Sequence, residues 1–232
     1  MTTRRAFLLS TAAMLAAPAY SDVPECAVFT KDRQAAIDSR GALRRLKDGN
    51  ARFVSGRSIR CDLTAQVRAT AAGQAPFAAV VGCIDSRVPP ELIFDQQIGD
   101  IFCARIAGNF VNTDIIGSLE FATKLAGAKA IVVLGHSECG AIKGAVDDAK
   151  LGNLTAMLAN IRPAVAEVAA REGARTSKDA AFVQAVAVQN AKDAAAMLLS
   201  RSRVLQELVA SGELSVSVAM HDVSTGVVAW LA

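Results

Sequence analysis

Two short groups of residues in this chain combine side chain types that bind metal ions. They are Cys83-Ile84-Asp85-Ser86-Arg87 and His136-Ser137-Glu138-Cys139-Gly140. Each lies at the end of a short apolar stretch, which is typical of a buried parallel strand. In an open α/β sheet, ligands bind beyond the carboxyl ends of neighbouring strands. We therefore expect the two groups to meet at one edge of a sheet, although 53 positions separate Cys83 from His136.

The four candidate ligands are two cysteines, a histidine and an aspartate. This set suits Zn(II) better than a hard cation such as Mg(II). We predict one zinc ion per chain, bound by Cys83, Asp85, His136 and Cys139. Arg87 can pair with the Asp85 carboxylate through two parallel hydrogen bonds. The alternative is two unrelated features, a buried cysteine and a loop histidine, because both residue types also occur as ordinary core residues.

The segments that must position these groups alternate between strands and helices. Short stretches that are apolar on both faces predict strands over 76–83, 101–106 and 130–135. Apolar spacing and crossover lengths predict helices over 41–55, 64–72, 113–126, 137–146, 153–171, 179–200 and 204–209. Residues 22–40 show no clear periodicity.

The C-terminal part differs from the rest in its pattern. Residues 214–220 alternate strictly, and a second apolar run, 227–230, follows Ser224-Thr225-Gly226, so a closing hairpin is expected. Strands that alternate with helices predict an α/β fold, with a central, mainly parallel sheet flanked by helices. The C-terminal hairpin would add an antiparallel strand at the edge of that sheet.

Composition indicates one globular domain. The chain has 232 residues, of which 52% are hydrophobic, and its formal net charge is only +3. These numbers allow one sizeable core. No basic run or stripe is present, which argues against a nucleic-acid partner. Beyond the N-terminus, charged residues or glycines interrupt every apolar stretch before it is long enough to span a bilayer.

The N-terminus has the pattern of an export signal. Arg4 and Arg5 precede an apolar stretch of small residues, which ends at Ala17-Pro18-Ala19. The paired arginines followed by Phe7 resemble a twin-arginine signal. We predict that residues 1–21 are the signal, that 22–232 form a single catalytic domain, and that the protein is periplasmic. The alternative is a cytoplasmic protein with an N-terminal amphipathic helix.

The remaining cysteines and the second histidine have less defined roles. Five cysteines are an odd number, which argues against a pure disulfide framework. Cys26 and Cys61 could form a disulfide in an oxidising compartment, but spacing alone does not decide this. Cys103 lies inside an apolar stretch and is predicted to be a core residue. His221 is predicted to be a structural or surface residue, with a proton shuttle as the alternative.

Taken together, the two groups resemble the zinc-binding motifs of the β-class carbonic anhydrases. The resemblance includes Cys-x-Asp-x-Arg after one apolar stretch and His-x-x-Cys-Gly after another. It extends to Gly49-Asn50-x-x-Phe53, Gln74-x-Pro76, and Gly99-x-x-Phe102 with Arg105. These matches cover about residues 41–145, and they imply the same α/β fold.

The resemblance implies a specific reaction. Zinc bound by Cys83, His136 and Cys139 would hold a hydroxide, which attacks carbon dioxide to give bicarbonate and a proton. Asp85 and Arg87 would be the catalytic pair. Asp85 either coordinates the zinc or pairs with Arg87 and orients the hydroxide. We expect a switch between these two arrangements, open at higher pH and closed at lower pH.

The resemblance also implies a small substrate pocket. Gln74 would supply an amide near the substrate, and Phe102 would line the pocket. In the family these residues can come from the neighbouring subunit, so a homodimer or higher homo-oligomer is expected. Phe121 replaces a tyrosine that is frequent at this position in the family. Val80 replaces the tryptophan of a regulatory bicarbonate site, so that regulatory site is not expected here.

Two other functions fit some of these observations. The same zinc site could hydrolyse carbon disulfide or carbonyl sulfide, as relatives of the family do. A non-enzymatic zinc-binding or thiol-redox protein is the second alternative. Redox chemistry would favour a close Cys-x-x-Cys pair, which this chain lacks. A storage protein would not need Asp85 and Arg87 beside the metal.

Overall fold

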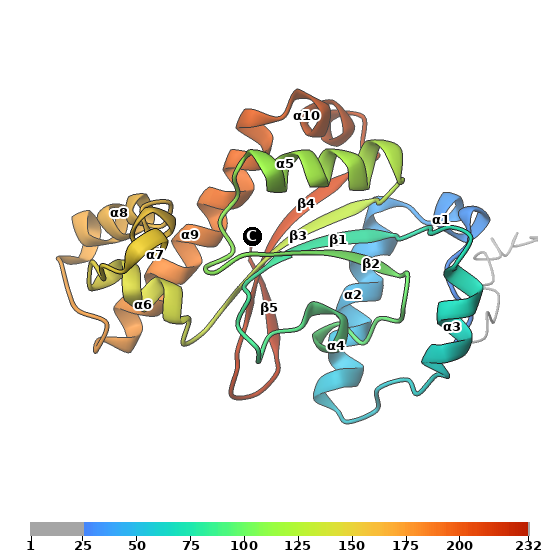
Figure 1. Ribbon diagram of the computed structural model, residues 1–232, viewed down its shortest axis with the longest axis horizontal. Helices are drawn as coiled ribbons and strands as arrows, with labels where there is room; N and C mark the ends of the chain where they lie inside the picture. The colour runs from blue at the N-terminus through green and yellow to red at the C-terminus, as the bar shows by residue number, and fades with distance from the viewer. Residues whose placement is uncertain (1–25, 232) are drawn as a thin grey trace, which may run out of the picture.

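The computed structural model describes residues 26–231, which form a sheet covered by helices (Figure 1). Its strands are β1 (Ala78–Gly82), β2 (Ile101–Arg105), β3 (Ala130–His136), β4 (Ser215–His221) and β5 (Val228–Leu231). Its α-helices are α1 (Lys31–Ala36), α2 (Ser39–Val54), α3 (Leu63–Thr70), α4 (Pro90–Ile93), α5 (Thr113–Glu120), α6 (Gly140–Val146), α7 (Gly152–Leu158), α8 (Arg162–Glu172), α9 (Ala180–Arg201) and α10 (Arg203–Ala210). A π-helical segment, η1 (Phe121–Leu125), directly continues α5. The predicted export signal, 1–21, lies outside the described residues.

The strands form one sheet in the order β2-β1-β3-β4-β5. The first four strands in this order run parallel, and β5 pairs with β4 in the antiparallel direction. Every residue of β1 and β3 is buried, which explains why both segments are apolar on each face. The predicted fold class, including its C-terminal antiparallel pair, is confirmed.

Helices cover both faces of the sheet (Figure 1). The long helix α9 packs along β3 and β4, and η1 packs against β1, while α2 packs against β3 from the other side and contacts α4. Gly135 on β3 makes room for the side chain of Met220 on the neighbouring β4, because a Cβ there would lie 2.6 Å from the Met220 sulfur. The sheet is thus enclosed along its centre, and its carboxyl edge remains for the loops that follow the strands.

Most predicted elements match the structure closely. The strands expected over 76–83, 101–106 and 130–135 correspond to β1, β2 and β3. The helix expected over 113–126 is present as α5 continued by η1, and the one over 179–200 is α9. The side chain of Asn112 begins α5 by accepting a hydrogen bond from the Ile115 N–H, 3.0 Å away.

Three predictions about helices were wrong. The helix expected from Ser137 begins only at Gly140, because Glu138 has a left-handed φ of 56° that no helix can include. The segment 153–171 is divided into α7 and α8, with Pro163 in the first turn of α8, where its missing N–H has no cost. For residues 22–40, which show no clear periodicity, no helix was predicted, yet they contain α1 and the start of α2.

A disulfide holds the start of the described chain. Cys26 and Cys61 are bonded, with their Cα atoms 5.4 Å apart, which answers the question that their spacing left open. Nearby, Phe29 is buried, and its ring packs on that of Phe77 with the centroids 5.0 Å apart. The segment before α2 is therefore attached to the body of the protein by a covalent bond and by aromatic packing.

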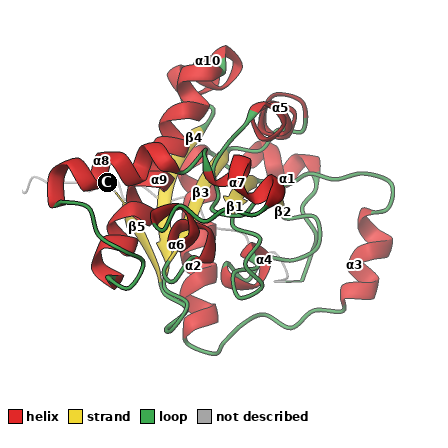
Figure 2. Cartoon of the chain, turned by 60° about the vertical axis from the view of Figure 1, so that its left-hand side comes forward, coloured by secondary structure: helices red, strands yellow, loops and turns green. Residues whose placement is uncertain are grey.

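Two features of the outer surface bear on assembly. Helix α3 lies at the edge of the molecule, away from the sheet (Figure 2), and exposes Leu63 and Val67. Strand β2 is an edge strand whose residues are all only half-buried. In residues 26–231, no helix combines the length and the apolar character needed to cross a membrane.

Candidate metal centre

The residues of the centre come from the ends of two neighbouring strands. Cys83 directly follows β1, and His136 is the last residue of β3. Since β1 and β3 pair in parallel along the whole of β1, their carboxyl ends lie side by side. Cys139 precedes α6 as its N-cap residue. The expectation that two strand ends would meet at one edge of the sheet is met.

Three of the four predicted ligands converge. The sulfur atoms of Cys83 and Cys139 are 4.0 Å apart, and these two atoms and a ring nitrogen of His136 all lie within 4.8 Å of one another. All three residues are buried, since Cys83 is 3% exposed and Cys139 and His136 are each 1% exposed. A buried cluster of two sulfurs and one imidazole is the donor set of a zinc site with one position left open.

The orientation of the His136 ring favours a cation. Its Nδ1 lies 2.8 Å from the carbonyl oxygen of Ser137, and donating a proton there leaves the lone pair on Nε2. Within the described part of the chain, the buried Nε2 has no hydrogen-bond partner. A buried polar atom without a partner is costly, so this nitrogen fits a metal ligand.

The two thiols also fit a cation. The hydrogen bond from Cys139 lowers the pKa of Cys83, and the same bond, together with burial, raises the pKa of Cys139. The pair therefore shares one proton, because two buried thiolates this close repel each other. A soft divalent cation removes this obstacle by binding both thiolates, so the residues present fit zinc.

Asp85 does not join the three converging donors. Its carboxylate accepts hydrogen bonds from Nε of Arg87 at 2.9 Å, from a terminal nitrogen at 2.7 Å, and from the Arg87 backbone N–H at 3.0 Å. These bonds, first of all those of the side chain, hold the pKa of Asp85 well below its usual range. Of the two arrangements expected for Asp85, the structure shows the one paired with Arg87.

Arginine side chains hold the loop that contains Cys83 and Asp85. Nε of Arg105 donates to the Cys83 carbonyl at 2.8 Å, and a terminal nitrogen donates to the Asp85 carbonyl at 2.7 Å. Arg87 also donates to the carbonyl of Glu138 at 3.3 Å, which joins the two loops of the centre. Arg105 was noted in the sequence only as part of a motif, and its hydrogen bonds were not predicted.

The two predicted substrate residues lie away from the centre of their own chain. Phe102 pairs with Ala79, four residues before Cys83, which corresponds to about 13 Å along the strand. Gln74 is exposed before the start of β1, so the whole of that strand, about 16 Å long, separates it from Cys83. Neither side chain can contact a ligand held by the cluster of the same chain.

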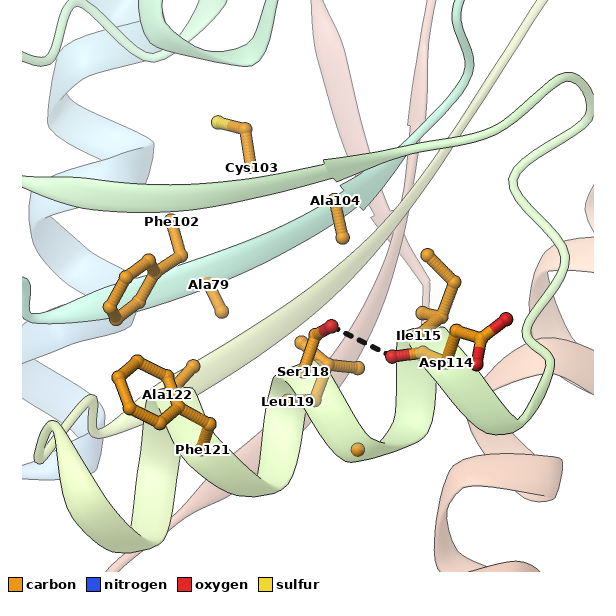
Figure 3. A pocket seen from close by; sticks show the side chains of 11 residues that line it. Ala79, Phe102, Cys103, Ala104, Asp114, Ile115, Ser118, Leu119, Phe121 and Ala122 are labelled. Atoms are coloured by element: carbon orange, nitrogen blue, oxygen red, sulfur yellow. Dashed lines mark hydrogen bonds between the residues drawn. The ribbon is translucent and has the colours of Figure 1, made fainter.

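Phe102 instead lines an apolar groove between β2 and α5 (Figure 3). Its ring lies edge-on to that of Phe121, with the centroids 6.2 Å apart, and Phe121 remains about half exposed. Figure 3 shows the side chain of Cys103 on the other side of β2, pointing away from these rings. Cys103 is only half-buried and is not part of the core that was predicted for it, although burial raises the pKa of its thiol.

His221 lies next to the centre without joining it. It pairs with His136 in the register of β3 and β4, and it is buried. Burial lowers its pKa, which favours the neutral imidazole. His221 is not among the three converging donors, and within the described residues neither of its ring nitrogens has a hydrogen-bond partner, so both roles weighed from the sequence stay predictions.

Comparisons with known proteins agree with this geometry. A family model described as carbonic anhydrase matches residues 78–228. The chain is 36% identical to carbonic anhydrase 2 of Mycobacterium tuberculosis over 191 residues, which cover 80% of this chain and 89% of that protein. It is 32% identical to a carbonic anhydrase of Pseudomonas aeruginosa, with 68% of this chain and 74% of the relative covered.

Solved structures give the same result. One of the tetrameric β-carbonic anhydrases of Sordaria macrospora superposes with a TM-score of 0.65 at 31% identity, over 71% of this chain and 85% of that one. A Coccomyxa β-carbonic anhydrase in complex with acetazolamide superposes with a TM-score of 0.66 at 26% identity, over 72% and 77% of the two chains. The chain therefore belongs to the β class of the carbonic anhydrase family of enzymes.

Proposed function

We propose that this enzyme binds one zinc ion per chain and catalyses the reversible hydration of carbon dioxide to bicarbonate and a proton. The convergence of two buried thiols with the unpartnered Nε2 of His136 is the observation on which this rests. Cys83, His136 and Cys139 would hold the ion. A zinc ion bound there supplies a Lewis acid strong enough to make hydroxide available near neutral pH.

Asp85 and Arg87 would orient the attacking group. Arg87 keeps the Asp85 carboxylate ionised, so that it can accept a hydrogen bond but cannot donate one. An acceptor in this position fixes the direction of the proton on the nucleophile and leaves its lone pair free for carbon dioxide. In this proposal, the site is open to water when Asp85 is paired with Arg87.

The same pair would switch the enzyme off. If Asp85 left Arg87, its carboxylate could take the open position of the zinc and exclude water. Protonation of the attacking group at lower pH favours this closed arrangement, and higher pH favours the paired one. The bond from Arg87 to the Glu138 carbonyl supports the paired arrangement, because it attaches the arginine to both loops of the centre.

A second copy of the chain would complete each substrate pocket. Gln74 and Phe102 are too far from Cys83 to serve the centre of their own chain. Phe102 and the exposed Phe121 line the groove beside the open edge of β2, and Leu63 and Val67 are exposed on α3. Association through these apolar surfaces would bring the groove of one chain to the centre of another.

Metal analysis together with hydration kinetics tests the centre. We expect wild type and Cys103→Ala to contain about one zinc per chain and to hydrate carbon dioxide. Cys139→Ala should lose both zinc and activity, because two ligands cannot retain the ion. The two variants make the same chemical change inside and outside the cluster. Equal zinc content in both would refute the assignment, and parallel assays with carbonyl sulfide and carbon disulfide distinguish the substrates.

We also propose that residues 1–21 direct export and are removed, leaving 22–232 as the mature periplasmic enzyme. The signal pattern in the sequence supports this, and so does the Cys26–Cys61 disulfide, since such bonds persist in oxidising compartments. Intact mass of the protein recovered from the periplasm should equal that of 22–232, and it should rise by two hydrogens on reduction. A full-length mass, or no change with reductant, contradicts the proposal.

A further inference from the structure

A buried chain of hydrogen bonds connects α9 to the metal centre. We propose that Asn190, on α9, is a positioning residue for the thiolate of Cys83. Its side-chain amide holds Gly108 so that the Gly108 backbone N–H stays on the sulfur of Cys83. The inference rests on the proposed function, because it treats Cys83 as a ligand of the metal.

The contact with sulfur comes first. The Gly108 N–H donates to Sγ of Cys83 over 3.2 Å, in the buried interior behind the centre. Sγ of Cys139 lies 4.0 Å from the same sulfur, so the Cys83 sulfur has two polar contacts, one from each residue. A hydrogen bond from an amide also withdraws electron density from a thiolate and so weakens its donation to a cation.

The backbone around Gly108 forms a tight turn. The N–H of Asn109 donates to the carbonyl of Ile106 at 2.9 Å, and Gly108 has a φ of +80°, as required at the third position of a type II turn. A Cβ on Gly108 would lie 2.5 Å from Cδ1 of Ile161. Glycine is therefore needed here, but a glycine does not itself prevent the peptide from rotating.

Asn190 adds a second constraint to this turn, because it holds the Gly108–Asn109 peptide, next to the peptide whose N–H contacts Cys83. Its Nδ2 donates to the Gly108 carbonyl at 2.7 Å, and the residue is only 3% exposed. It lies on the buried face of α9, next to Ala191 and Ala187. Burying an amide among apolar residues is unfavourable unless its hydrogen bonds are made, so this asparagine has a specific partner rather than a filling role.

The expected consequences concern the metal as well as the rate. Removing the amide takes away one of the two hydrogen bonds that hold the Gly108–Asn109 peptide, so the turn loosens and the bond from the Gly108 N–H to Cys83 lengthens. The thiolate then becomes richer in electrons, which shifts its charge-transfer band, but it also loses its fixed position, and we expect this loss of position to outweigh the stronger donation in the zinc affinity. Changes in the groups that support metal ligands typically weaken metal binding about 10-fold to 100-fold.

The test compares Asn190→Ala and Asn190→Asp with the control Leu198→Ala. Leu198 is also buried on α9 but lies two helical turns, about 12 Å, further along the helix than Asn190, so its variant reports general destabilisation. The aspartate has nearly the size of asparagine but repels the Gly108 carbonyl instead of donating to it. Zinc affinity is measured by competition with a chelator. The thiolate-to-cobalt charge-transfer band is recorded after cobalt replaces zinc.

We expect both Asn190 variants to bind zinc about 10-fold more weakly than the control, and their cobalt bands to move to lower energy. The inference is overturned if both variants match Leu198→Ala in affinity and retain the wild-type band. A wild-type protein that binds cobalt without any thiolate band would instead refute the proposed centre itself. The two failures are therefore distinguishable.

Discussion

At the scale of single residues, the state of Asp85 determines what the centre can do. All three hydrogen bonds to its carboxylate come from Arg87, two from the side chain and one from the backbone. The same guanidinium reaches the Glu138 carbonyl in the other loop. Arg87 thus occupies the acceptor atoms that Asp85 would otherwise offer to the metal, and its removal should change the coordination of the ion.

We predict that Arg87→Ala retains about one zinc per chain but hydrates carbon dioxide at least about 10-fold more slowly. The released Asp85 can then take the fourth position and exclude water. Arg87→Lys should lie in between, because a lysine cannot form the two parallel bonds. Steady-state kinetics and metal analysis measure both quantities.

The double variant Asp85→Ala with Arg87→Ala is the control for this prediction. It lacks the carboxylate that closes the site, so its cobalt form should bind an external anion such as azide, whereas cobalt-loaded Arg87→Ala should not. The proposed movement of Asp85 onto the metal would be contradicted if Arg87→Ala hydrated carbon dioxide at the wild-type rate. It would also be contradicted if cobalt-loaded Arg87→Ala bound azide as well as the cobalt-loaded wild type does.

The sequence predicted the three donors that converge, Cys83, His136 and Cys139, but it also predicted Asp85 among them, and it did not predict the residues that support them. Cysteine and histidine are rare and chemically distinctive, and their positions after two apolar strands indicated where they would meet. Asn190 and Gly108 are common residue types, and 82 positions separate them. Whether they share a hydrogen bond depends on how α9 crosses the sheet, which no local pattern records. The distance of Gln74 from the centre of its own chain likewise became evident only from the structure.

At the scale of elements, the start of α9 offers a test that does not involve the metal. The Asp179 side chain accepts a hydrogen bond from the Phe182 N–H at 3.0 Å, and this bond lowers the pKa of Asp179. A carboxyl whose pKa is lower in the folded state stabilises the fold fully above its ordinary pKa, about 4. That contribution is lost as the pH falls through the lower, folded-state pKa.

We therefore predict that Asp179→Ala lowers the melting temperature by roughly 3 °C at pH 7, measured at equal zinc content. The difference from wild type should shrink as the pH is lowered below about 4. Asp179→Asn keeps an oxygen that can accept the bond, so it should melt close to wild type near neutrality. A difference for Asp179→Ala that does not depend on pH would show that the charge of the cap contributes nothing.

The strands were easier to predict than the short helices. β1 and β3 are buried on both faces, and this requirement is visible as continuous apolar residues. Helix α1 has no such pattern. It is held by its Thr30 cap and by Gln34, whose amide donates to the carbonyls of Pro76 and Ala126. The late start of α6 likewise depends on the left-handed backbone of Glu138, which its residue type does not suggest.

At the scale of the whole molecule, the shared pocket predicts complementation between two inactive variants. Cys139→Ala lacks one ligand and so has no working centre of its own, but it keeps Phe102, which would line the pocket of its partner. Phe102→Ala keeps all three metal ligands but can no longer line the pocket of its partner. If two chains build each pocket, a co-expressed one-to-one mixture of dimers should regain about a quarter of the wild-type activity per chain, because half the dimers have one complete site.

Each variant alone should be inactive or strongly impaired, and both should form the same oligomer as wild type by size-exclusion chromatography. Activity of the mixture equal to the average of the separate variants would show that each chain completes its own pocket. If, in addition, wild type were monomeric by size-exclusion chromatography, the proposal that chains associate through the edge of β2 would be wrong.

The Cys26–Cys61 disulfide affects where local unfolding of the described chain can begin. Loosening and proteolytic cutting usually start at the ends of a chain. Here the first described residue is tied to a segment 35 positions away, and closing a loop of this length disfavours the unfolded chain by roughly 4 kcal/mol. Within residues 26–231, the exposed connection between α8 and α9, residues 173–176, contains no disulfide, and hydrogen bonds from Ser177 to Asp147 hold its end. Among the described residues, that connection is therefore a more open place for attack than the segment around Cys26.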